Sequence, residues 1–186
     1  MTARPTDPAA VGDYPHLVAD DISQIIYRSW DEIFGLPRKE AEAYQLRAAR
    51  RRLEQLLPHV AALKDQVEQA GVSRIEKLDD LVPLLFNHTT YKSYPISLLE
   101  NNRFDMLTRW LQRMTVVDLS GIDARECRGV DEWMTLLETK TPLQIFHTTG
   151  TTGKLSFIPR TTLEADFWNH IYLSSYAGLS SEAGIK

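Results

Sequence analysis

The hydrophobic and polar positions of the chain follow a helical period over most of its length. Apolar residues recur at steps of three and four from Asp20, and the run ends at Gly35. A second helical stretch is predicted over residues 38–57, where charged residues fill one face until Pro58 interrupts it. A third continues to Gly71, a residue typical of a helix C-terminal cap.

The middle of the chain gives shorter signals. Capping-box spacing predicts helix starts at Ser73–Glu76 and at Ser97–Glu100. Apolar residues at helical spacing predict further helices over 104–114 and 130–137. Residues 115–119, Thr-Val-Val-Asp-Leu, are predicted to form a strand.

The last third of the chain changes period. Apolar residues alternate as in strands on both sides of the polar segment 147–154. Thr161 and Glu164 then have the spacing of a capping box and predict a final helix. The order of helices, then strands, then one late helix predicts an α/β fold. We expect residues 1–18 to be disordered and residues 19–186 to form part of one domain.

The polar segment between the two predicted strands has an unusual composition. Its glycines allow tight turns and close approach of backbone N–H groups to a ligand, its threonine hydroxyls are adaptable donors, and its lysine adds a positive charge. These are features of a phosphate-binding loop. The predicted ligand-binding residues are Thr148, Thr149, Gly150, Thr151, Thr152, Gly153 and Lys154.

The loop does not fit the P-loop of nucleotide triphosphatases. That motif requires four residues between its glycines and a Ser or Thr after the lysine. Here two residues separate Gly150 from Gly153, and Leu155 follows Lys154. An ordinary hairpin turn stays open as the structural interpretation, because Thr and Gly are common in turns.

The loop resembles the phosphate-binding signature of the adenylate-forming (AMP-binding) superfamily, in which a Ser/Thr-Gly-Thr-Thr-Gly-Lys loop holds the phosphates of ATP. The upstream segments Gln69–Val72 and Leu78–Pro83 are similar in order to the phenylacetate–CoA ligase-like and acyl-protein synthetase-like branch. The chain departs from the family after Lys154, where Leu155-Ser156-Phe157 replaces the usual proline, lysine and glycine exit.

This resemblance implies an α/β fold in which a helical N-terminal region leads into the first strands of an incomplete adenylate-forming large domain. It implies an ATP-dependent, AMP-forming acid–thiol ligase whose substrates are ATP with Mg²⁺, a small carboxylic acid and CoA. The family's adenine-binding motifs and mobile C-terminal subdomain follow the loop, and none is found before Lys186. The chain is therefore expected to be an N-terminal fragment, inactive in adenylation on its own.

Composition is that of a globular domain, with 43% hydrophobic and 25% charged residues among 186. The net charge of −4 gives no reason to expect a nucleic acid partner. No apolar run approaches the roughly 20 residues of a membrane span, and no signal sequence is recognisable. The single cysteine, Cys127, excludes an internal disulfide and favours a cytoplasmic location.

For several other residues with charged or reactive side chains, a structural role is favoured over a functional one. Arg47 and Arg50–Arg52 form a basic cluster that is interpreted as a solvated helix face neutralised by nearby glutamates. Cys127 lies among charged residues and is interpreted as a structural thiol in a polar surface loop. No histidine spacing predicts a metal site. Asn87–Pro95 is interpreted as a loop that packs its tyrosines against the core. His147 either contacts the ligand or caps the end of a strand.

Two further functions stay open. One is a non-catalytic helical interaction module that retains a Thr/Gly hairpin. The other is a small phosphate- or nucleotide-binding protein. The identity of the acid, and whether its acceptor is CoA or a protein thiol, do not follow from the sequence.

Overall fold

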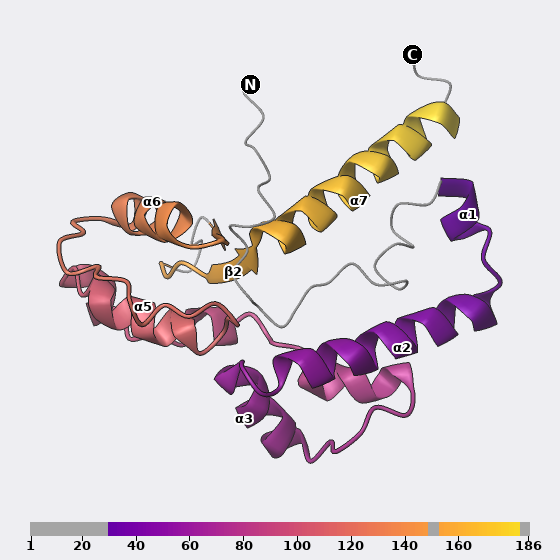
Figure 1. Cartoon of the computed structure of the whole chain (residues 1–186), viewed down its shortest axis with the longest axis horizontal. Coiled ribbons are helices and arrows are strands. Elements are labelled where there is room, and N and C mark those ends of the chain that lie inside the picture. Colours follow the sequence, from indigo (N-terminus) through magenta and orange to yellow (C-terminus); the bar gives the residue numbers. More distant parts are fainter. Residues whose placement is uncertain (1–29, 149–152, 183–186) are drawn as a thin grey trace.

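The computed structural model describes residues 30–148 and 153–182 (Figure 1). Its α-helices are α1 (Trp30–Phe34), α2 (Arg38–Leu56), α3 (Ala61–Ala70), α4 (Ser97–Glu100), α5 (Phe104–Gln112), α6 (Val130–Lys140) and α7 (Thr162–Glu182). Two 3₁₀-helices are η2 (Leu78–Leu84) and η3 (Thr90–Lys92), and the strands are β1 (Leu143–His147) and β2 (Phe157–Thr161). The described residues therefore form a helix-rich α/β structure.

The main core lies between α5, α6 and the hairpin. Phe104, Leu107 and Leu111 recur at helical spacing on α5 and are fully buried. Trp133 of α6 packs against this face, with its ring 6.1 Å from that of Phe104. Its indole N–H donates to the hydroxyl of Thr108 at 2.9 Å, so the one polar atom of the buried ring is satisfied.

Strands β1 and β2 form an antiparallel hairpin in which Leu143 lies opposite Thr161 and His147 opposite Phe157. Leu143 and Ile145 alternate into the core, as does Phe157 from the second strand. The predicted pair of strands is confirmed. It places the Thr/Gly segment at the tip of the hairpin.

Helices α2 and α3 form a second part of the structure, below α7 in Figure 1. The predicted boundary between them is confirmed, and so is the predicted cap, since Gly71 has φ +64°. Glycine adopts this left-handed conformation without the strain that a residue with a Cβ atom incurs there. Arg113 links α3 to the end of α5, because its carbonyl accepts from Ala62 N–H at 2.9 Å and its guanidinium pairs with Asp65 at 2.5 Å.

The predicted strand over residues 115–119 is wrong. The Gln112 side chain accepts a hydrogen bond from Leu119 N–H at 2.5 Å and donates to the Val117 carbonyl at 2.9 Å. This amide satisfies the backbone groups that a neighbouring strand would otherwise bind. Val117 and Leu119 are buried in the main core, so their apolar pattern reflects packing without a ladder.

Of the two capping boxes predicted at Ser73 and Ser97, only the second is followed by a helix at the predicted position. No helix starts at Ser73, because the chain enters η2 at Leu78, where the Asp80 carboxylate accepts from the N–H groups of Glu76 and Lys77. These bonds lower the pKa of Asp80. Helix α4 does form at Ser97, but its N-cap residue is Ile96 and no side chain caps it.

The capping box at the start of α7 is confirmed. Glu164 accepts from Thr161 N–H at 2.8 Å, and the Thr161 hydroxyl accepts from Glu164 N–H at 3.2 Å. Of the helix predicted from Asp20, only α1 is within the described residues, and Gly35 follows it as predicted. The expected disorder of residues 1–18 lies outside the described residues.

Candidate functional site

The candidate site is the tip of the β1–β2 hairpin. Of its predicted residues, the structure describes Thr148, Gly153 and Lys154, while residues 149–152 (Thr149, Gly150, Thr151 and Thr152) lie outside the described residues. The ladder between the strands reaches His147 and Phe157. The two ends of the Thr/Gly segment are therefore held side by side.

Thr148 extends the hairpin by one further pair. Its N–H donates to the Ser156 carbonyl at 3.4 Å, and its hydroxyl oxygen accepts from Ser156 N–H at 3.3 Å. Ser156 is buried, whereas Thr148 is exposed. The Thr148 hydroxyl proton is not used in these bonds and can donate to a ligand.

Gly153 and Lys154 form the other end of the segment. Gly153 has φ +78°, which favours glycine, and a Cβ placed there would meet no atom of the described residues within 4 Å. Space beside Gly153 is thus open. The Lys154 ammonium donates to the backbone carbonyl of Tyr94 and lies 4.5 Å from the centroid of the Tyr94 ring.

Tyr94 is the residue that fixes the exit from the loop. It is fully buried, its hydroxyl donates to the Leu155 carbonyl at 2.8 Å, and its ring packs 4.9 Å from Trp110 and 5.5 Å from Phe157. Burial raises the pKa of Tyr94 to about 12. This tyrosine therefore connects the aromatic core directly to Lys154.

The role of Tyr94 was not predicted from the sequence. Its burial agrees with the interpretation of Asn87–Pro95 as a loop packed on the core, and Tyr91 is half-buried. The polar residues of this loop serve the turn itself, because the Asn87 side chain accepts from the N–H groups of Thr89 and Thr90. Contact between Tyr94 and Lys154 joins residues far apart in sequence, and no local pattern signals it.

His147 ends β1 and is exposed. Its Nδ1 atom lies 3.5 Å from the Thr148 carbonyl oxygen, at the limit of a hydrogen bond. Both predicted roles, ligand contact and strand end, are compatible with this position.

An apolar cavity of 260 Å³ lies at the foot of the hairpin. Its walls come from α2, α3, η2 and the start of α7, and include Leu56, Leu63, Leu84 and Tyr91. Arg52 and Glu164, which also line it, form an ion pair. The cavity therefore offers mainly apolar surface, with one charge-compensated polar edge.

Two arginines of the basic cluster on α2 bind other segments of the fold, which was not predicted. The guanidinium of Arg50 donates to the carbonyls of Ile75 at 2.6 Å and Glu76 at 3.2 Å, and Arg52 pairs with Glu164. These two arginines bridge α2 to distant segments, so the interpretation as a solvated face neutralised by nearby glutamates is wrong for them. Arg47 lies over the Tyr44 ring at 4.5 Å.

Cys127 is buried in the main core. Burial raises the pKa of its thiol, and the nearby Glu132 carboxylate adds to this effect. A raised pKa disfavours the reactive thiolate. The geometry therefore supports a structural thiol, although the side chain itself is not at the surface of its loop as predicted.

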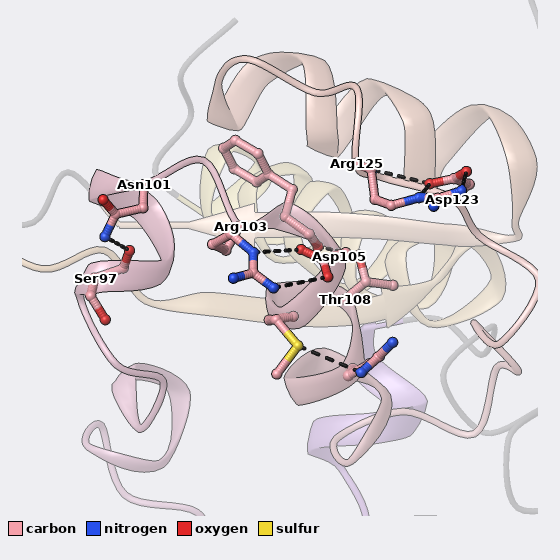
Figure 2. Close-up of polar contacts among 10 residues, drawn as sticks. Ser97, Asn101, Arg103, Asp105, Thr108, Asp123 and Arg125 are labelled. Atoms are coloured by element: carbon pink, nitrogen blue, oxygen red, sulfur yellow. Dashed lines mark hydrogen bonds and ion pairs between the residues drawn. The ribbon is translucent and has the colours of Figure 1, made fainter.

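A polar pocket of 580 Å³ lies between α5 and the loop 118–125, and Figure 2 shows the polar contacts of Asp105 and Asp123, two of the residues that line it. Asp105 faces the guanidinium of Arg103 at 3.3 Å, and Asp123 binds Arg125 through both carboxylate oxygens, at 2.9 and 2.6 Å. These contacts lower the pKa of both carboxyl groups, that of Asp123 to about 2. Asp105 and Asp123 are thus each compensated by an arginine, and Asp118, a third carboxylate of the pocket, accepts from Ser120 N–H at 2.9 Å. With these carboxylates engaged locally, the pocket is a weaker candidate than the hairpin tip.

Comparisons with known proteins do not identify a family. No family model matches the sequence, and neither the curated proteins nor the solved structures include a significant match to it. Among the helices of the described residues, none is long and apolar enough to cross a membrane.

Proposed function

We propose that the hairpin tip binds the phosphates of ATP, and that the chain is the N-terminal portion of an AMP-forming acid–thiol ligase. The observation that carries this proposal is that Lys154 is held by Tyr94 at the exit of the Thr/Gly segment, next to Gly153, beside which space is open. The sequence of residues 148–154 and its resemblance to adenylate-forming enzymes supply the ligand class. The substrates are ATP, a small carboxylic acid and CoA.

The described residues fit an anionic ligand. An ammonium group has three N–H donors, and the Tyr94 carbonyl uses one of those of Lys154. The remaining donors, with the Thr148 hydroxyl, are available to phosphate oxygens. Contact with the Tyr94 ring and carbonyl holds the lysine in place before the ligand arrives, which reduces the entropy that binding costs.

Such a loop acts through electrostatics. When a carboxylate attacks the α-phosphate of ATP, negative charge grows on the departing pyrophosphate. Donors placed at that charge stabilise the transition state, and each contributes about 3 kcal/mol. Mg²⁺ would be held mainly by the phosphates themselves. Its position does not depend on a protein metal cluster.

Binding of ATP to the full chain tests this proposal. We expect Mg·ATP to raise the melting temperature and to show saturable binding by calorimetry, with pyrophosphate as a competitor. Lys154→Met keeps the apolar stem over Tyr94 and removes the charge, so it is expected to abolish most of the binding. Lys140→Met, a change at an exposed lysine on α6, is the matched control and is expected to bind normally.

Exchange of pyrophosphate into ATP in the presence of carboxylic acids is expected to stay at background for this chain alone, because the family's later motifs are not found before Lys186. If ATP does not bind, or binds equally well to Lys154→Met, the hairpin is an ordinary turn. The helical interaction module would then be the better interpretation. Acid-dependent exchange above background would contradict the expectation that this chain is inactive in adenylation on its own.

A further inference from the structure

The cavity of 260 Å³ at the foot of the hairpin is lined by segments that are distant in sequence. Leu56 of α2, Leu63 of α3 and Leu84 of η2 supply aliphatic walls, Met114 follows α5, and Pro159 comes from β2. Leu63 and Leu84 are buried. Protein interiors leave few voids larger than a water molecule, so a space of this size between packed elements indicates room for a ligand.

The volume and lining of the cavity set the kind of molecule that fits. An apolar cavity of about 150 Å³ binds benzene in another protein, and sites for drug-sized molecules begin at about 300 Å³. The cavity lies between these values. Phe86 and Tyr91, whose rings meet edge to face at 5.9 Å, add aromatic wall, and Met114 adds a side chain of adaptable shape. An aromatic ring with a short substituent matches this size and lining.

Two residues that line the cavity carry hydroxyl protons with no acceptor among the described residues. Thr115 is 5% exposed, and its oxygen accepts from Val117 N–H at 3.1 Å, which leaves its proton unused. Tyr91 is half-buried, and its hydroxyl makes no hydrogen bond within the described part of the chain. Burial raises the pKa of Tyr91, so this proton is retained. Buried polar groups are nearly always paired, and an acceptor on a ligand would supply the partner.

The ionic edge of the cavity is neutral as a whole. Arg52 and Glu164 pair there, and the other carboxylate oxygen of Glu164 accepts from Thr161 N–H at 2.8 Å. A carboxylate that entered the cavity would lose its hydration and compete with Glu164 for the same guanidinium. The lining therefore favours an uncharged ligand over an anion.

We propose that this cavity binds an uncharged aromatic molecule with a carbonyl oxygen, which accepts hydrogen bonds from Tyr91 and Thr115. The ring of the ligand lies against the aliphatic and aromatic walls. Thr161, at the end of β2, lines the cavity, whereas the Thr/Gly segment lies before Phe157, at the other end of this strand. The site is therefore separate from the hairpin tip and does not depend on ATP binding there.

Titration of the full chain with two matched probes tests the ligand class. Acetophenone carries a carbonyl group on a phenyl ring, and benzoate has the same size with a negative charge. Ligand-detected NMR is expected to show saturable binding of acetophenone, with benzoate more than about tenfold weaker because its charge would be buried. Equal or tighter binding of benzoate overturns the uncharged ligand class. If acetophenone does not bind, the cavity is not a site for such a ligand and the proposal is wrong.

The Tyr91 hydroxyl is tested with a third probe, isopropylbenzene, which has a similar size and no acceptor. Tyr91→Phe is expected to weaken acetophenone roughly fivefold, the effect of one hydrogen bond, and not to weaken isopropylbenzene. Tyr44→Phe is the matched control, because Tyr44 lies on α2 and is not among the residues that line the cavity. Equal effects of Tyr91→Phe on both probes, or none on acetophenone, overturn the assigned hydrogen bond.

The position of the ligand is tested in two ways. Val116→Phe adds a ring to the wall and is expected to abolish acetophenone binding, so a folded variant that still binds overturns the site. Because a larger side chain can disturb packing, nuclear Overhauser effects in the unaltered chain supply the second test. We expect them between acetophenone and the methyl groups of Val60 and Leu84, and contacts only elsewhere overturn the site.

The two proposed sites are read separately in one further variant. Lys154→Met is expected to bind acetophenone as tightly as the unaltered chain does, since Lys154 is not among the residues that line the cavity. Loss of acetophenone binding in Lys154→Met would contradict the separation of the two sites.

Discussion

The aromatic residues of α6 and α7 have opposite environments. Trp133 of α6 is fully buried, with a satisfied indole N–H and ring contacts to Phe104 and Phe157 at 6.1 and 5.1 Å. Trp168 of α7 is 50% exposed, and its ring contacts the guanidinium of Arg160. The same residue type is thus enclosed in the core in one helix and half-exposed in the other.

This difference follows from what surrounds each helix. Helix α6 lies between α5 and β1, so its apolar side is enclosed on the chain's own core. Helix α7 packs at its base on the hairpin and against α1. An apolar pattern alone does not distinguish a helix enclosed in the core from one with an exposed apolar side, because the distinction depends on which other segments reach the helix.

Truncation in the core has the largest expected effect. Trp133→Ala removes the ring between Phe104 and Phe157 and leaves the Thr108 hydroxyl without its donor, so we expect a loss of about 3–5 kcal/mol in the free energy of unfolding. Urea denaturation followed by circular dichroism measures it. Trp133→Phe keeps most of the volume and is expected to cost clearly less. Equal costs for Ala and Phe would contradict the packing argument.

The second largest change in the free energy of unfolding is expected from the loss of a single hydroxyl in the core. Tyr94→Phe leaves the Leu155 carbonyl without its donor, for which we expect a cost of about 1–3 kcal/mol in unfolding free energy. The ring remains for Lys154, so ATP binding in the same variant is expected to persist. A normal stability with lost ATP binding would show that the hydroxyl acts on the ligand and not on the fold.

The sequence predicts local structure well where the cause is local. The hairpin strands, the cap at Gly71 and the capping box of Thr161 and Glu164 each depend on residues within a few positions of one another. The predicted strand at 115–119 failed because the Gln112 amide, rather than a neighbouring strand, satisfies that backbone. A side chain that binds the backbone in place of a neighbouring strand does not alter the alternation of apolar residues, so the sequence pattern still resembles that of a strand.

The candidate site is predictable only in part. Composition singled out the Thr/Gly segment, because glycine, threonine and lysine each have a separate reason to be near phosphate. The support from Tyr94 for Lys154, and that from Glu164 for Arg52, join residues distant in sequence. Such contacts depend on how the elements pack, and they cannot be predicted from local patterns in a single sequence.

Tyr94 also predicts a pH dependence of stability. Burial raises its pKa to about 12 from an ordinary value near 10, so the folded chain retains the phenolic proton more strongly than the unfolded chain. The stability gained is complete below pH 10 and is lost as the pH rises toward 12, by roughly 1 kcal/mol at pH 11. Urea unfolding between pH 9 and about 11 measures it. Tyr94→Phe isolates this effect from other titrations, and an unchanged slope in that variant would exclude Tyr94 as its source.

The smallest expected change in the free energy of unfolding is that of truncating Trp168, in contrast to the large effect expected at Trp133. Trp168→Ala is expected to cost under about 1 kcal/mol, because half of the ring is already in water and its contact with Arg160 is exposed. A double-mutant cycle of Trp168→Ala and Arg160→Gln measures the coupling between the ring and the guanidinium. Trp133→Ala combined with Arg160→Gln is the control and is expected to be additive, since Trp133 lies in the core between α5 and the hairpin. Additivity in both cycles would contradict a stabilising contact between Trp168 and Arg160.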